Sequence, residues 1–378
     1  MKIIKTYNYI RTCVFNGIKL NIVFLLLAFY FIPFFTYAQP DSTAKKHHFL
    51  VLPIIARSIE TNWSFGAALS STFNLRSPTD TLTRTSNLQA LGLYSLKKQL
   101  VLALNGSIYF PGEKYILNQQ ISYSYFPDKF WGLGKNSPHS NEEPYDYKQF
   151  YVYLHPKRLV GKRLFVGILY EMQSLWDVQY IPGGIFDKQQ IVGRNGYIVS
   201  GLGASLTYDS RNNAFAPDRG SMLQIYFNHF DPVIGSRYRY TNYVIDLRHF
   251  LKIYKEQVLA LQAYGFFNSG EVPLRSLASL GGANSLRGYY DGRYRDKNQY
   301  AIQAEYRIPL FWRLGCVAFA DIGNVASTFG DLNFDYLKYS YGAGVRFALS
   351  KAERLNLRLD YGFGKSSSGF YFQLGEAF

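Results

Sequence analysis

The sequence predicts an all-β fold, a transmembrane β-barrel of about sixteen antiparallel strands of the kind that spans a bacterial outer membrane. Three observations lead to this prediction. The 378-residue chain begins with a stretch typical of an export signal. After Phe35 it contains no apolar run long enough for a spanning helix, yet 18% of its residues are aromatic, including 33 Tyr and 30 Phe. Its apolar and polar residues also alternate in short segments, as in a barrel wall.

The first element, residues 1–38, is predicted to be a cleaved signal peptide. Basic residues are followed by an apolar run at about 22–35 and then by Ala38, after which cleavage is expected. The alternative, an inner-membrane anchor helix, is disfavoured because the run is shorter than the ~20 residues that a spanning helix needs. Residues 39–48 are then expected to be a short periplasmic linker and residues 49–378 the barrel, which leaves no room for a periplasmic domain.

The charge and cysteine content limit the partners that we expect. The formal net charge is +15, and removal of residues 1–38 with their four cations leaves +15 − 4 = +11. For an exported chain, membrane and lipopolysaccharide phosphates are the expected counter-charge, and we expect no nucleic-acid partner. Cys13 lies in the predicted signal peptide and Cys316 remains alone, so no intrachain disulfide and no cysteine metal cluster are expected.

Alternation defines the strands. In segment 353–364, for example, Leu357 and Leu359 share one face while Arg358 and Asp360 share the other. The complete set of predicted strands is 49–57, 62–75, 84–96, 99–110, 115–126, 147–156, 162–175, 196–209, 219–230, 238–252, 256–268, 298–308, 313–323, 339–349, 353–364 and 369–378. An even number suits a bacterial single-chain barrel, and fourteen strands also remain compatible with the pattern.

The connections between these strands are unequal in length. If both chain ends lie in the periplasm, the outward connections include the longest, at 127–146, 176–195, 269–297 and 324–338. Inward connections such as Tyr254-Lys255 and Phe311-Trp312 are tight. Short periplasmic turns and long outer loops are typical of outer-membrane barrels.

The loop at 269–297 contains the stretch SLGGANSLRGYYDGRYRD, which is rich in glycine, arginine and tyrosine. Unstructured loops of this length are uncommon unless they are functional or disordered. The aromatic residues can pack, and the glycines let the backbone approach other groups closely. We therefore expect the loop to fold inward. The alternative is a solvated outer loop whose arginines contact lipopolysaccharide phosphates.

Two carboxylates follow this loop on the next two strands. Glu305 lies on the predicted lumen face, and Asp321 is placed on that face because a carboxylate facing lipid is costly. Arg287 is the candidate to bridge both acids through charge-assisted hydrogen bonds, each worth about 1.5–3 kcal/mol. Arg293 is the alternative arginine in the loop.

The order GGANSLRGYY, AEYRIPL, FADIGNV and GFYFQLGEAF resembles the C-terminal barrel of the outer-membrane assembly-factor superfamily. That superfamily includes the BamA- and TamA-like proteins, the two-partner-secretion transporters and the bacterial surface antigens. The resemblance implies a sixteen-stranded barrel in which an Arg-Gly-aromatic loop core tucks inside and its arginine meets acids on the following strands. The matching residues are Gly281, Gly282, Arg287, Gly288, Tyr289, Glu305, Phe319, Asp321 and Gly323.

Two further segments match the superfamily and one feature departs from it. Asp209, Arg211, Pro217 and Gly220, in YDSRNNAFAPDRG, resemble a periplasmic turn before a strand. Phe378 resembles the C-terminal signal by which outer-membrane barrels are recognised for insertion. Typical members also carry periplasmic polypeptide-transport-associated (POTRA) repeats, which we do not find here. The capture of periplasmic clients would therefore need a separate partner.

The resemblance implies a non-catalytic role in inserting or translocating a protein or lipid substrate at the outer membrane. Two alternatives remain open, a passive porin-like channel narrowed by the loop and a lipid-modifying enzyme. No Gly-x-Ser-x-Gly elbow and no His-Glu-x-x-His motif occurs. We therefore predict no catalytic residue, no metal site and no cofactor, although a Ser–His pair assembled only in space leaves no sequence signature.

Overall fold

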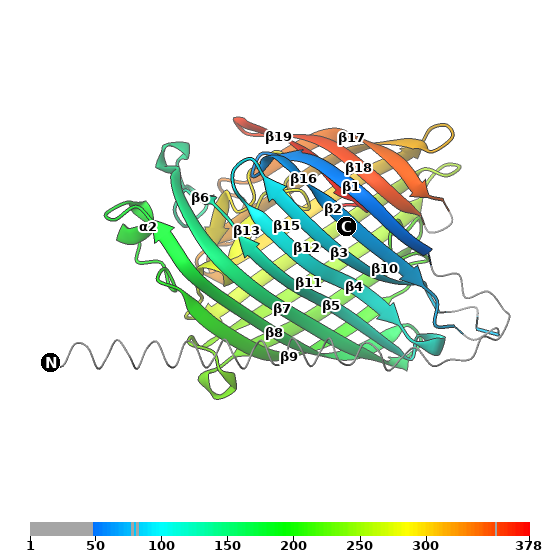
Figure 1. The fold of residues 1–378 in the computed structure, drawn as a ribbon, viewed down its shortest axis with the longest axis horizontal. Helices are drawn as coiled ribbons and strands as arrows, with labels where there is room; N and C mark the ends of the chain where they lie inside the picture. Colours follow the sequence, from blue (N-terminus) through cyan, green and yellow to red (C-terminus); the bar gives the residue numbers. More distant parts are fainter. Residues whose placement is uncertain (1–47, 77–78, 81–82, 352–353) are drawn as a thin grey trace. The chain divides into compact units, whose positions relative to one another are not determined.

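Long antiparallel strands form the wall of this protein in the computed structural model, which describes residues 48–76, 79–80, 83–351 and 354–378 (Figure 1). The predicted signal peptide, residues 1–38, lies outside the described residues, as does the linker up to residue 47. The strands are β1 (His48–Ser58), β2 (Asn62–Phe73), β3 (Ser86–Ser95), β4 (Leu100–Tyr109), β5 (Tyr115–Tyr125), β6 (Asp128–Phe130), β7 (Glu143–Gly161), β8 (Leu164–Tyr180), β9 (Tyr197–Asp209), β10 (Gly220–Phe230), β11 (Tyr240–Lys252), β12 (Val258–Gly270), β13 (Ala278–Leu280), β14 (Tyr294–Asp296), β15 (Asn298–Pro309), β16 (Leu314–Ala326), β17 (Lys338–Ser350), β18 (Leu355–Gly364) and β19 (Ser367–Leu374).

Helical turns are few and short. They are η2 (Pro111–Glu113), η3 (His139–Asn141), α2 (Ile185–Lys188), η4 (Pro232–Ile234), η5 (Leu274–Ser276) and η6 (Phe329–Asp331). Across the described part of the chain, none of the helices combines the length and the apolar character needed to cross a bilayer.

Each wall strand pairs antiparallel with the next wall strand along the chain, from β1 with β2 to β18 with β19. The described residues form a 17-stranded sheet. One of the seventeen, β6, is a three-residue segment that pairs with β7 beyond the end of β5. The remaining sixteen strands confirm the predicted number.

The two edge strands of this sheet, β1 and β19, lie against each other (Figure 1). Within their described residues, however, no ladder of paired residues joins them. We call this junction of β1 and β19 the seam. Among the described residues, paired backbone hydrogen bonds therefore join all the other pairs of neighbouring wall strands but do not join β1 to β19.

The strands form because the alternation of residue types matches the two faces of the wall. In β15, Ile302 is 48% exposed while its neighbours Ala301 and Gln303 are buried. The same outward pattern recurs around the sheet at Leu102, Ile168, Leu202, Phe227, Leu247 and Tyr341. An apolar outer belt with a polar interior is the arrangement that suits a wall surrounded by lipid.

The predicted outward end carries the longest connections, including residues 181–196, 271–297 and 327–337. Strands β7 and β8 also extend further toward this end than predicted, because Tyr145 pairs with Tyr180 beyond the expected limits of 147–156 and 162–175. Aromatic and aliphatic side chains from the strand ends and loops pack into one buried cluster here. Its larger members are Phe130, Tyr145, Tyr147, Phe186, Tyr197, Phe230, Tyr240 and Leu274.

The opposite end differs from the prediction at the C-terminus. The predicted strand 369–378 is wrong at its end, because β19 stops at Leu374. Gly375 adopts a φ of 89°, a conformation that glycine adopts readily, and turns the chain out of the wall. Phe378 is therefore buried against Phe250 and Val258 rather than paired in the sheet.

Candidate functional site

The loop at 271–297 folds into the barrel, as the sequence predicted, instead of lying solvated outside. Its short strands β13 and β14 pair with each other and form a hairpin. Leu280, Leu286 and Tyr289 of this hairpin pack against Ala301 of β15 and Val325 of β16. The loop thus has a small core of its own on the inner face of the wall.

Arg287 lies at the tip of this hairpin with a side chain that is fully buried. Its Nη1 donates to Glu305 Oε1 at 2.5 Å and to Asp360 Oδ2 at 3.0 Å. Its Nη2 lies 3.6 Å from Asp321 Oδ1, and its backbone N–H donates to Asp321 Oδ2 at 3.3 Å. The guanidinium carbon sits 3.5 Å from the centre of the Phe319 ring. One cation from the loop therefore meets three carboxylates from three wall strands.

The third of these acids, Asp360, was not predicted as a partner of Arg287, because the sequence analysis placed it only on one face of a strand together with Arg358. In the structure Asp360 is fully buried and lies closer to Arg287 than Asp321 does. Further cations balance the group, since Arg307 lies 2.9 Å from Glu305 and Arg346 lies 2.5 Å from Asp360. Buried charges are tolerated only when paired in this way.

Gly288 and Tyr289 attach the tip of the loop to β18 and β19. Gly288 has a φ of 114°, and a Cβ there would lie 2.7 Å from the backbone carbonyl carbon of Phe363. The hydroxyl of Tyr371 accepts from the Gly288 N–H at 2.9 Å and donates to the Tyr289 carbonyl at 3.0 Å. A glycine is required at 362 as well, because a Cβ there would lie 2.5 Å from the Arg287 carbonyl carbon. The loop tip therefore rests directly on strand backbone.

The same loop also reaches the other side of the seam. The Asp291 N–H donates to Glu60 Oε1 at 2.9 Å, and Glu60 lies in the turn between β1 and β2. The side chain of the neighbouring Ile59 covers Gly369 of β19, where a Cβ would lie 2.7 Å from Ile59 Cγ1. Glu60 is buried, and this burial raises the pKa of its carboxyl. Loop 271–297 is thus bonded to both sides of the seam, to Tyr371 of β19 on one side and to the β1–β2 turn on the other.

The remaining residues of the predicted loop motif lie in the same region. Gly281 and Gly282 have φ values of 114° and 96° in the hairpin. Gly323 gives the loop room, because a Cβ there would lie 3.1 Å from the side chain of Leu286. The alternative arginine, Arg293, is directed elsewhere, since it donates to the Ser137 carbonyl at 2.9 Å.

The predicted periplasmic turn is at the other end of the wall and is not brought near Arg287. Arg211 donates through Nε and Nη2 to both oxygens of Asp209, each at 3.0 Å. Arg84, from the β2–β3 connection, donates to the same carboxylate at 2.7 Å. Pro217 is buried, and Gly220 adopts a φ of 100° where the turn enters β10.

One arrangement carried no sequence signal because its members are scattered along the chain. His155 Nε2 lies 2.6 Å from Ser205 Oγ, and His155 Nδ1 lies 3.0 Å from the Tyr153 hydroxyl. Tyr153 and His155 line a cavity inside the barrel, and Ser205 is not among the residues that line it. In the part of the chain that the structure describes, no group of three His, Cys, Asp or Glu side chains could hold a metal ion.

Comparison with known proteins gives matches to one family of barrels. Residues 134–378 match the model of the Omp85 superfamily domain. Among solved structures, CdiB from Escherichia coli is similar with a TM-score of 0.57 at 13% identity, over 89% of this chain and 63% of that one. BamA from Haemophilus ducreyi lacking POTRA domains 1–3 is similar with a TM-score of 0.55 at 16% identity, over 87% and 70%. CdiB from Acinetobacter baumannii is similar with a TM-score of 0.54 at 12% identity, over 87% and 65%.

These structural similarities concern the fold, since the identities are low. The chain spans less than two thirds of the length of the two CdiB chains. No curated protein matches the sequence. Residues 48–378, as far as the structure describes them, form the barrel strands and their connections and contain no POTRA domain.

Proposed function

The chain belongs to the Omp85 superfamily, and on that premise we propose that it assists the insertion or translocation of a protein or lipid substrate at the bacterial outer membrane, without catalysing a reaction. The observation that carries this proposal is the seam. Its edge strands β1 and β19 touch without a ladder, while one loop is bonded to both sides of them.

An edge without a ladder offers unpaired backbone N–H and C=O groups. Such groups invite the addition of an extended strand from a client, which gains main-chain hydrogen bonds by pairing. The outward face of the wall is apolar at positions such as Leu69 and Ile302, so an opening at the seam would lead sideways into lipid. Loop 271–297 braces the wall beside that opening through Arg287.

The location and the partners belong to the same proposal. The predicted signal peptide and the apolar belt of the wall support an outer-membrane location, in contact with lipopolysaccharide. No POTRA repeats occur among the residues that the structure describes, and the proposal therefore includes a separate periplasmic partner that delivers protein clients to the barrel. The competing proposals remain a passive channel and a lipid-modifying enzyme.

A disulfide across the seam tests this mechanism. We would combine Ile59→Cys with Gly369→Cys in a Cys316→Ser background, since the Ile59 Cγ1 position that a sulfur would take lies 2.7 Å from a Cβ at 369. In the native host depleted of the wild-type protein, the oxidised variant should fail to restore outer-membrane protein or surface-lipid levels. Reduction should restore them.

A matched control links strands that are already joined by a ladder. Tyr226→Cys with Val244→Cys joins paired positions of β10 and β11, and it should leave function intact. Full function of the locked seam variant, combined with slower small-solute uptake after depletion, would contradict the proposal and favour a channel. For the enzyme alternative, pure protein would have to release fatty acid from phospholipid or lipid A, and Ser205→Ala would have to abolish that release.

A further inference from the structure

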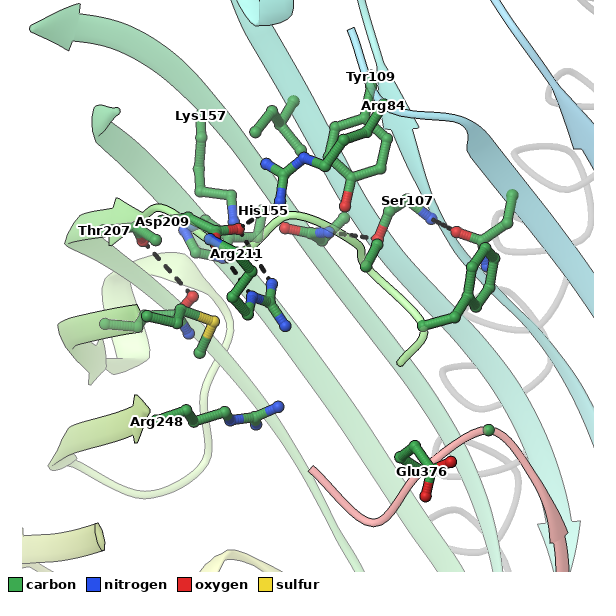
Figure 2. A pocket seen from close by; sticks show the side chains of 18 of the residues that line it. Arg84, Ser107, Tyr109, His155, Lys157, Thr207, Asp209, Arg211, Arg248 and Glu376 are labelled. Carbon is green, nitrogen blue, oxygen red and sulfur yellow. Dashed lines mark hydrogen bonds and ion pairs between the residues drawn. The ribbon is translucent and has the colours of Figure 1, made fainter. Parts of the chain in front are cut away.

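A cavity of about 440 Å³ opens inside the barrel at the end opposite the inward-folded loop. It lies between the β9–β10 turn, the inner faces of the neighbouring strands and the C-terminal residues after β19 (Figure 2). The residues of the predicted periplasmic turn, Asp209 and Arg211, line it together with Glu376. None of the contacts that hold the loop at the seam uses this cavity.

Lys157 is the first sign that the cavity is built for a ligand. This residue of β7 lines the cavity, and only 9% of it is exposed. In the described part of the chain its ammonium group has no hydrogen-bond or ion-pair partner. Desolvation of an ammonium group that has no hydrogen-bonded partner is costly, and an anion bound in the cavity would offset that cost.

The acids of the cavity form no ion pair with Lys157, and each of them is bonded to other groups. Asp209 accepts from Arg211 and Arg84. Asp246 accepts from Arg248 at 2.6 Å and from Gln262 at 2.8 Å. Glu376 is likewise held by Arg346 at 2.7 Å and by Asn356 at 2.7 Å.

What remains unoccupied is a set of cationic donors. Arg211 and Arg248 each use Nε and Nη2 for their own aspartate, which leaves Nη1 of both without an acceptor among the described residues. Figure 2 shows the two guanidinium groups pointing the same way, toward the space in front of Glu376. Together with Lys157 they provide three positive groups, and arginine is well suited to phosphate oxygens because its donors form a planar fork.

Part of the remaining lining is polar and uncharged, and it lies beside apolar side chains such as Phe215 and Met222. Amides and hydroxyls face the cavity at Asn87, Gln89, Ser107, Asn118, Thr207 and Gln224. Such groups bind ligand hydroxyls by donating and accepting hydrogen bonds. A volume of about 440 Å³ is in the range of small-molecule sites.

We propose that this cavity binds a sugar phosphate, with the phosphate at Lys157, Arg211 and Arg248 and the sugar hydroxyls on the amide-lined wall. The ligand is either a free sugar phosphate or the phosphorylated sugar head of a lipid. This assignment is independent of the proposed function, because it uses neither the seam nor the loop.

Isothermal titration calorimetry on the folded protein in a non-ionic, phosphate-free detergent solution tests the assignment. Glucose 1-phosphate should bind at one saturable site, and glucose or inorganic phosphate should bind at least 10-fold more weakly. Lys157→Met should weaken the binding of glucose 1-phosphate at least 10-fold. Lys148→Met is the matched control on the same strand, since Lys148 pairs with Asp177 at 2.7 Å outside the cavity, and it should leave binding unchanged.

A second variant keeps the test decisive if Lys157→Met does not fold. Arg248→Gln leaves Asp246 with its bond from Gln262 and should also weaken binding at least 10-fold. Competition by micellar lipid A would identify the ligand as a lipid head, and its failure to compete would identify a free sugar phosphate. The assignment would be overturned if glucose 1-phosphate did not bind, or if both folded variants bound it as tightly as the wild-type protein does. Tighter binding of a glutamate-rich peptide than of glucose 1-phosphate would also overturn it.

Discussion

At the scale of single residues, Arg287 is the most constrained side chain of the loop. Its guanidinium meets Glu305, Asp321 and Asp360, and no part of it is exposed. An ion pair this deeply buried is weak evidence for stability as a whole, because desolvation offsets the attraction. Removal of one partner is a different matter, since it leaves a charge buried without compensation.

Arg287→Ala should therefore leave the barrel folded but lower its resistance to heat, at a cost of about 3–5 kcal/mol. Asp360→Asn should cost more than Asp321→Asn, because Asp360 lies 3.0 Å from Arg287 and Asp321 lies 3.6 Å away. The temperature at which the folded band disappears on a semi-native gel measures all three variants.

The control for this series is Arg239→Ala, because Arg239 forms an exposed pair with Asp231 whose loss should cost no more than about 1 kcal/mol. If Arg287→Ala matches wild type while Arg293→Ala is heat-sensitive, the loop is held by the other arginine.

Glu60 leads to a pH-dependent prediction at the same scale. Burial raises its carboxyl pKa in the folded state, so its contribution to stability is complete below the unfolded pKa and is lost as pH rises through the folded value. Glu60→Gln keeps an acceptor for the Asp291 N–H without the charge. The variant should match wild type near pH 4 and unfold at a higher temperature than wild type at pH 8. A variant less stable than wild type at pH 8 would show that the charge of Glu60 is needed there.

At the scale of elements, the sequence predicted the wall strands better than the segments that leave the wall. Period-two alternation locates a strand such as 298–308 because one face is apolar and the other polar along its whole length. It could not show that β19 ends at Leu374, since residues 375–378 continue the aromatic and polar character of the strand. The role of Asp360 was hidden for another reason, because β18 is the fourth wall strand after the loop and only the folded sheet brings Asp360 to Arg287.

The C-terminal segment should act as packing for the lumen once the barrel is folded. Phe378 is buried with Phe250 and Val258, and its carbonyl oxygen accepts from Arg307 Nη2 at 3.2 Å. Phe378→Ala should destabilise the folded barrel by about 3 kcal/mol through lost packing. Phe311→Ala removes a 70% exposed ring and is the matched control, which should unfold at the wild-type temperature.

The same variant also addresses the predicted insertion signal. If Phe378 is recognised during insertion, Phe378→Ala should reduce the amount of inserted barrel as well as its heat resistance. Quantifying the membrane fraction and the gel transition separates these effects. A wild-type amount of inserted barrel together with wild-type heat resistance would contradict both the packing role and the insertion-signal role of Phe378.

At the scale of the whole molecule, the two ends of the lumen are occupied by different parts of the chain. Loop 271–297 and the aromatic cluster fill one end, while the β9–β10 turn and the C-terminal segment narrow the other around the basic cavity. An open pore is therefore a poor description of the folded state. Among the described strands, no ladder crosses the seam, so the seam is the part of the wall with the fewest hydrogen bonds to break.

The bonds of Arg287 and Gly288 also have a consequence for biogenesis. Their partners lie at Glu305, Asp321, Asp360 and Tyr371, all later in the chain than the loop itself. The loop can form all of these bonds only after the last two strands have been added to the wall. A loop bonded in this way therefore indicates that the polypeptide is complete. A chain truncated before β18 would leave a basic, aromatic hairpin exposed, and a protease that removes such chains would have a ready means of distinguishing finished barrels from unfinished ones.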